Sequence, residues 1–438
     1  MTGLVLWGAI VSAALLCLRA PFAFVLIYIW IEYFRPQEVA PAQFAWISIS
    51  LTVGVFAAIG MIIAAQKNSF RPSVEFFWLL TLALWITLTT TWAVVPAAWI
   101  KWDTAIKTVL FCALLSQLTW KAEQVEAILL AIIAGSAAQI CSFGIKGLIT
   151  GGGYQQELGV VGGNAGLAES STLAVFSAAM VPFYWFIANN SILLRKNIVL
   201  RLAAISGTFL TVSAIIATNA RAGLVSLVIC GGLVLARSKR GFLSVLIIIA
   251  LLIAAIPFIA TTDWFARMNT LSSVRADDSS MQRVAVWSWT MDYVKSHPWG
   301  GGFNVDQTNR FTVEAENEAG EVTISGKAFH SIYFEVLGEH GFLGFLLYFG
   351  LIGRVLFRLI KFQRSVKREN RKNNWGREFA IASLFSWAGL LVGCAFIGIA
   401  FMPFIFFFLV ISLAILTVAK RAAIVVRPGH VPAAKSIL

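Results

Sequence analysis

Long apolar runs recur throughout this chain of 438 residues. A helix needs about 20 consecutive, mostly apolar residues to cross the hydrocarbon core of a bilayer. Eleven runs approach or exceed that length, near residues 44–65, 75–95, 103–119, 125–149, 167–188, 198–217, 221–236, 241–260, 329–360, 378–397 and 399–419. Only 13% of the residues are charged, whereas a soluble domain has about 25%. The sequence therefore predicts an all-α, polytopic membrane protein and excludes a soluble enzyme, a secreted disulfide scaffold and a disordered chain.

The first 34 residues form a further apolar stretch, too long for one straight span and short for two. Arg19 and Pro21 interrupt it, so we expect a broken helix or a tight helical pair there. One crossing by this stretch and the eleven runs give about twelve spans, and two crossings give thirteen. We favour twelve, with both termini on the same side.

Basic residues between the runs predict the orientation. They gather at residues 67–71, 195–196, 237–240 and 361–377, which all lie on one side if the spans alternate. Cytoplasmic loops of membrane proteins are enriched in Lys and Arg, so that side is predicted to be cytoplasmic, together with the basic tail after residue 419. Topology thus accounts for the net charge of +13, and we expect membrane lipids but no nucleic acid among the partners.

The predicted domain order follows from this orientation. Transmembrane helices occupy residues 1–260, a hydrophilic loop occupies 261–329, and further transmembrane helices occupy 330–438, with the basic cytoplasmic loop at 361–377. Residues 261–328 contain nine acidic and six basic residues, a net charge of −3, which fits an extracytoplasmic loop. Arginines in this loop are not topology signals and need another explanation.

Two arginines on the outer side are candidate anion-binding residues. Arg221 follows a short turn between two apolar runs, and ionisable residues at membrane depth are candidate functional sites. Arg283 lies in residues 277–296, where Ser and Asp precede a periodic stretch, so a capped helix is predicted that ends before a glycine turn at 300–302. The planar guanidinium group suits phosphate. The alternatives are a snorkelling Arg221 and a solvated Arg283.

His330 lies where the outer loop re-enters the membrane. Its spacing of ten residues from His340 fits neither zinc-binding histidine motif, so a zinc pair is not expected. A lone histidine at an interface is commonly structural, but one near two arginines is a credible base at neutral pH. With no Cys-X-X-Cys pair and no Walker-type loop, these residues predict an outward site for an anionic, phosphate-bearing, lipid-linked substrate and a group transfer that uses no cofactor.

The same residues resemble the O-antigen ligase family, within the O-antigen ligase/polymerase superfamily of bacterial membrane glycosyltransferases. His330-Ser331, nine residues and then the Gly-Phe-Leu-Gly at 341–344 resemble the pattern H-[NSQ]-x9-G-x-x-G. Arg221 resembles the arginine turn of the superfamily, although Asn219 and Ala220 stand before it where a serine is usual.

Two further stretches are similar to members of this superfamily. Arg283-x-x-x-Trp287, with the proline and glycines of residues 298–302, is similar to the large periplasmic loop. Residues 30–36 are similar to a subgroup of O-glycosylation ligases. The likeness covers most of residues 200–400.

The resemblance implies a GT-C type glycosyltransferase in the bacterial inner membrane with a periplasmic active site. Such an enzyme moves a polysaccharide from undecaprenyl pyrophosphate to a sugar hydroxyl of lipid A-core, without metal or nucleotide and with inversion. By position, His330 would be the general base. Arg221 and Arg283 would bind the pyrophosphate, and Arg267 is a weaker candidate for the same role.

Three alternative functions stay open from the sequence. An O-antigen polymerase or a protein O-glycosylation ligase would use the same donor with another acceptor. A non-catalytic transporter of the lipid-linked glycan would need charges deep in several spans, usually within paired inverted repeats.

Overall fold

The structure is a computed structural model, and helices account for most of what it describes. It describes residues 22–41, 49–66, 72–118, 120–151, 169–194, 197–237, 278–314, 321–366 and 375–425, with residues 7, 8, 12 and 167. The main helices are α2 (Phe22–Phe34), α3 (Pro36–Val39), α5 (Ile49–Gln66), α6 (Val74–Thr90), α7 (Ala98–Leu115), α8 (Ala122–Thr150), α9 (Ser170–Asn190), α10 (Ile198–Ala217), α11 (Arg221–Ala236), α14 (Asp278–Ser296), α15 (Ile332–Ser365), α16 (Trp375–Gly393) and α17 (Pro403–Val425).

Every predicted apolar run within the described residues forms a helix. Four of these helices, α8, α9, α15 and the α16 segment, are long and apolar enough to cross a membrane, and shorter apolar helices accompany them. An all-α, multi-pass membrane protein is thereby confirmed. The count of twelve spans stays a prediction. The run at 241–260, Arg267 and the break at Arg19 and Pro21 lie outside the described residues.

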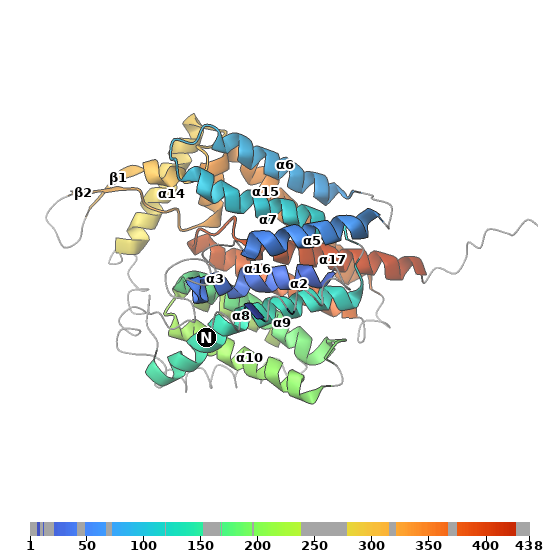
Figure 1. Ribbon diagram of the computed structural model, residues 1–438. Helices are drawn as coiled ribbons and strands as arrows, with labels where there is room; N and C mark the ends of the chain where they lie inside the picture. The colour runs from blue at the N-terminus through green and yellow to red at the C-terminus, as the bar shows by residue number, and fades with distance from the viewer. Residues whose placement is uncertain are drawn as a thin grey trace, which may run out of the picture.

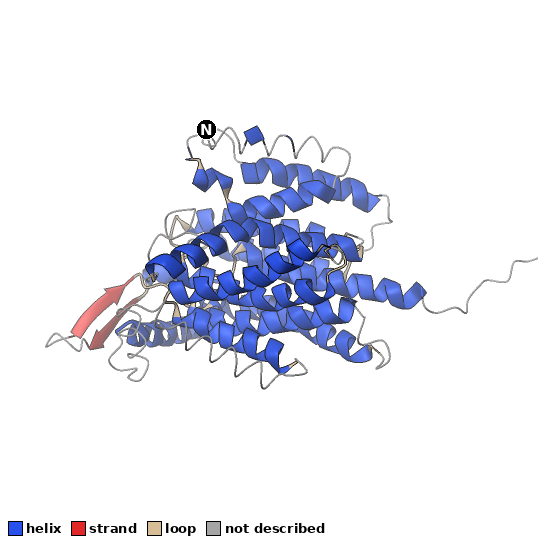
Figure 2. Ribbon diagram, turned by 90° about the horizontal axis from the view of Figure 1, so that it is seen from below, coloured by secondary structure: helices blue, strands red, loops and turns tan. Residues whose placement is uncertain are grey.

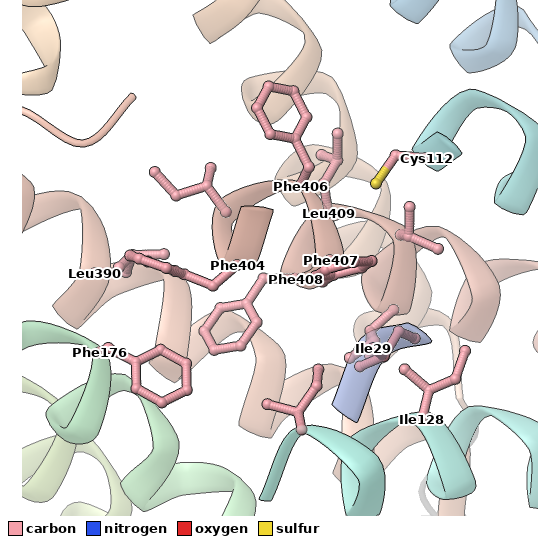
Figure 3. Close-up of a cluster of buried hydrophobic side chains, with 14 of the residues drawn as sticks. Ile29, Cys112, Ile128, Phe176, Leu390, Phe404, Phe406, Phe407, Phe408 and Leu409 are labelled. Carbon is pink, nitrogen blue, oxygen red and sulfur yellow. The ribbon is translucent and has the colours of Figure 1, made fainter. Parts of the chain in front are cut away.

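The core of the bundle is built around α17. Its phenylalanines Phe404, Phe407 and Phe408 point in different directions and meet side chains of several other helices (Figure 3). Phe176 of α9 lies with its ring centroid 5.3 Å from that of Phe404, and Tyr28 of α2 lies 6.4 Å from that of Phe407. A helix that is apolar all round is buried on all sides, so α17 is expected at the centre and α2, α9 and α16 around it.

The two strands and α14 lie together at one end of the helical bundle. Strands β1 (Arg310–Glu314) and β2 (Glu321–Ser325) pair antiparallel and project from the helices beside α14 (Figures 1 and 2). We call this the hairpin end. Helix α15 also begins here, directly after the segment that follows β2.

The long predicted run at 329–360 is not one continuous helix. Gly341 has φ +64° and ψ −168°, which interrupts α15 near its start. The glycine turn packs against this break: the Gly301 and Gly302 N–H groups donate to the Gly338 and Glu339 carbonyls, at 3.0 and 2.8 Å. A Cβ on Gly341 would collide with the backbone of residues 298–300. The break therefore needs glycine, and its freed carbonyls are satisfied by the turn.

Candidate functional site

His330 lies between the β2 strand and α15, in a backbone conformation that favours glycine, with φ +48°. Helix α14 holds this segment in place. The indole N–H of Trp287 donates to the Phe329 carbonyl at 2.8 Å, and the indole ring stacks on Phe334 with centroids 5.1 Å apart. Trp287 thus binds the chain on both sides of His330. The predicted helix is confirmed as α14, its cap lies outside the described residues, and Arg283 lies one turn before Trp287.

Burial and the nearby positive charges keep the imidazole of His330 neutral. Burial lowers the pKa of His330, and the nearby Arg283 and Lys327 lower it further, to about 4, while Glu169 acts in the opposite direction. At neutral pH the ring therefore has a free lone pair that can accept a proton. The structure brings together two predicted residues, His330 and Arg283, with two that the sequence did not single out.

Lys327 is the first of these two additional residues. Its backbone is held by the buried Asn309, whose Oδ1 accepts from the Lys327 N–H at 2.9 Å and whose Nδ2 donates to the Lys327 carbonyl at 2.6 Å. Burial lowers the pKa of Lys327, and the charge of Arg283 lowers it further. Two cations close together repel each other, and a bound anion relieves that repulsion. This corner of the hairpin end is suited to an anionic ligand.

Glu169 is the second additional residue, and it caps α9. Its carboxylate accepts from the backbone N–H groups of Ser171 and Thr172, at 2.9 and 2.5 Å. These bonds satisfy N–H groups that the first turn of a helix leaves without partners. Glu169 therefore lies at a fixed position near His330, where it provides the negative charge among the cations.

Arg221 is the first residue of α11 and follows a buried turn in which Asn219 has φ +51°. The predicted turn between the two apolar runs is confirmed. Helices α9 and α11 approach closely, because a Cβ on Gly223 would collide with Ala174. Arg221 consequently lies beside the start of α9, on the side of the bundle where Glu169 neighbours His330.

A second charged cluster lies next to the glycine turn. Lys101 Nζ is 2.7 Å from Glu335 Oε1 and 2.7 Å from Glu339 Oε1. The sequence showed Glu335 and Glu339 one helical turn apart after His330, but it showed no partner for them. Lys101 lies 234 positions before Glu335, between two predicted apolar runs and in no motif.

Among the described residues, no group of three or more His, Cys, Asp or Glu side chains is arranged to hold a metal ion. The expectation that the reaction needs no metal stays a prediction. The roles assigned to Arg221, Arg283 and His330 also stay predictions, and Arg267 lies outside the described residues.

Comparison with known families gives two matches. Residues 1–192 match a family of unknown function, DUF5935, and residues 206–349 match the family described as O-Antigen ligase. No curated protein matches the chain. The second match contains Arg221, Arg283 and His330, whereas Glu169 and Lys101 fall within the first.

Proposed function

We propose that this chain, whose residues 206–349 match the O-antigen ligase family, is a multi-pass membrane glycosyltransferase that moves a glycan from undecaprenyl pyrophosphate to a sugar hydroxyl. We place the reaction at the hairpin end, on the periplasmic face of the bacterial inner membrane, within a GT-C type fold. The observation that carries this proposal is the partly buried His330 with the positive charges of Arg283 and Lys327 near it.

In the proposed reaction His330 removes the proton from the acceptor hydroxyl. The hydroxyl oxygen forms a bond to the anomeric carbon of the donor, and the bond from that carbon to the diphosphate oxygen breaks. Attack from the opposite face inverts the anomeric centre. The electron pair leaves with the diphosphate, whose growing negative charge is stabilised by Arg221 and Arg283. The electrostatic stabilisation that such preorganised cations provide is stronger where water is partly excluded.

Lys327 supports the same step. Its position beside Arg283 supplies a second cation to the diphosphate, and Asn309 fixes the backbone that carries it. A bound diphosphate would offset the two positive charges that lower the pKa of His330. Donor binding is therefore expected to raise the basicity of His330 just when the base is needed.

The expected effect of donor binding on the His330 pKa predicts different pH profiles for kcat/KM and for kcat. The acid limb of kcat/KM for the donor reports the free enzyme and should have a midpoint near the His330 pKa of about 4. The acid limb of kcat reports the substrate complex, so its midpoint should lie at higher pH, towards the ordinary value of 6.5. Initial rates between about pH 3.5 and 8 would measure both. Coincident midpoints would contradict the coupling between donor and base.

We assign lipid A-core as the acceptor. Purified protein would be incubated with undecaprenyl-pyrophosphate-linked glycan, with and without lipid A-core, in the presence of a chelator. A shifted lipid A-core ladder supports a metal-independent ligase. Longer lipid-linked chains without lipid A-core would identify a polymerase instead, and glycan on an added protein acceptor would identify a protein ligase. No transfer to any acceptor would overturn the proposed function.

A further inference from the structure

Four separate segments of the chain converge on Lys101 and its two carboxylates. Glu335 and Glu339 belong to the first turns of α15, and Lys101 belongs to α7. The second oxygen of Glu335 accepts from the backbone N–H of Ala400 at 2.9 Å, and Oε1 of Glu339 accepts from that of Asn304 at 2.9 Å. The cluster therefore joins α7, α15, the loop before α17 and the end of the glycine turn.

The hydrogen bonds of His340 show where an additional proton is needed. The Thr89 hydroxyl has one hydrogen, and it donates to the Ile86 carbonyl at 3.1 Å. With the hydroxyl hydrogen directed at that carbonyl, His340 Nδ1, 2.7 Å from the same hydroxyl oxygen, is the donor in that contact. In a neutral imidazole with its hydrogen on Nδ1, Nε2 is an acceptor.

His340 Nε2 therefore faces another acceptor. Glu339 Oε2 lies 3.9 Å away, and both side chains are fully buried. Neither atom has a hydrogen-bond partner among the described residues. Two bare acceptors buried side by side are unfavourable unless a hydrogen lies between them.

The charges of the cluster also favour an additional proton. One ammonium group faces two carboxylates, and Asp306 on the 3₁₀-helix at Val305–Thr308 interacts electrostatically with the same group. Burial raises the pKa of Asp306, against the opposing effect of Lys101. The rings of Phe303 and Phe401, which are uncharged, pack edge-on against His340. An excess of buried negative charge is relieved when one carboxylate binds a proton.

We propose that Glu339 carries a proton on Oε2, directed at His340 Nε2, and that Lys101, Glu335 and this protonated Glu339 form a cluster that positions His330. The positioning part rests on the proposed role of His330 as base. The oxygen–nitrogen distance is closed by a small rotation of the carboxyl group or by a bridging water.

Glu335 connects the cluster to His330. A Cβ on Gly398 would lie 3.4 Å from Glu335 Oε2 and 3.6 Å from the His330 backbone nitrogen, so both face the same glycine. His330 has φ +48°, a conformation that non-glycine residues keep only where the surrounding structure holds them. Glu335 is therefore a positioning residue, since its contacts to Lys101 and Ala400 hold the start of α15.

Two isosteric variants, Glu339→Gln and Glu335→Gln, separate these roles. A glutamine at 339 keeps an oxygen for Lys101 and Asn304 and places its N–H₂ towards His340. A glutamine at 335 turns a donor towards either Lys101 or Ala400, which are themselves donors. Glu335→Gln should therefore lower kcat on the order of 100-fold, because small displacements of a base have effects of that size, with the donor KM within about twofold. Glu339→Gln should retain at least about ten times more turnover than Glu335→Gln.

Infrared spectroscopy tests the proton itself. The wild type should show the C=O band of a buried protonated carboxyl, and Glu339→Gln should lack it. Asp103→Asn, which removes the exposed partner of Lys107 on α7, is the matched control and should keep both the band and the turnover.

The possible outcomes are distinct. A band that persists in Glu339→Gln, or a lower thermal midpoint for Glu339→Gln than for Glu335→Gln, overturns the proton assignment. Wild-type kcat in Glu335→Gln, or a loss that appears only in KM, overturns the positioning role. If the wild type transfers no glycan, the proposed function fails, but the infrared and unfolding measurements still test the proton.

Discussion

His330→Gln is expected to lower kcat by about 10²- to 10⁴-fold, the usual contribution of a positioned general base. Glutamine is polar and uncharged like the neutral imidazole, but its amide does not accept a proton at neutral pH. The donor KM should change little, because Arg221, Arg283 and Lys327 are retained. The measurement is the initial rate of glycan transfer at saturating donor in detergent or proteoliposomes.

His297→Gln is the matched control for this prediction. His297 lies in the same hydrophilic segment, is exposed, and stacks on Tyr293 with ring centroids 4.3 Å apart. Its replacement should leave kcat within about threefold of the wild type, as for most surface changes. If His330→Gln kept wild-type turnover, His330 would not be the base. Lipid-linked glycan that crossed a membrane at full rate without any transfer would support a transporter instead.

Arg283→Met is expected to lower kcat/KM for the donor by roughly 100-fold or more, since truncating one partner of a buried ionic contact costs about 2–5 kcal/mol. Unlike His330→Gln, this variant should raise the donor KM. It should also move the acid limb of kcat/KM upwards from about 4, because Arg283 is one of the charges that lower the pKa of His330.

Arg310→Met provides the comparison for Arg283→Met. Arg310 is an exposed arginine at the start of β1, and its loss should affect neither the donor KM nor the pH profile. A fall in kcat with an unchanged KM for Arg283→Met would exclude a role in binding the donor. An unmoved acid limb would show that Arg283 does not act on His330.

Lys327→Met should change the donor KM and the pH profile in the same direction as Arg283→Met, but by less. An ammonium group is a point charge without the bidentate geometry of arginine, so we expect the donor KM to rise by about tenfold. Loss of this charge should also raise the midpoint of kcat/KM, since Lys327 contributes to the lowered pKa of His330. Titration of donor concentration at several pH values measures both effects, and an unchanged KM would remove Lys327 from the site.

The sequence by itself determined the helices and the candidate residues. Apolar runs mark their positions because a bilayer admits helices whose backbone groups are satisfied internally. Local signals also located α14, the glycine turn and the short connection before Arg221. Arg221, Arg283 and His330 were identified because each belongs to a short motif.

Only the tertiary structure decided which side chains meet. Lys101 and Glu339 are 238 positions apart, and nothing in a single sequence pairs them. Lys327 and Glu169 became neighbours of His330 through Asn309 and the start of α9, both outside the motifs. The break at Gly341 depends on a turn forty residues earlier that replaces the lost helical bonds. Hydropathy and capping are local properties of a chain, whereas the charges around a buried base are set by long-range packing.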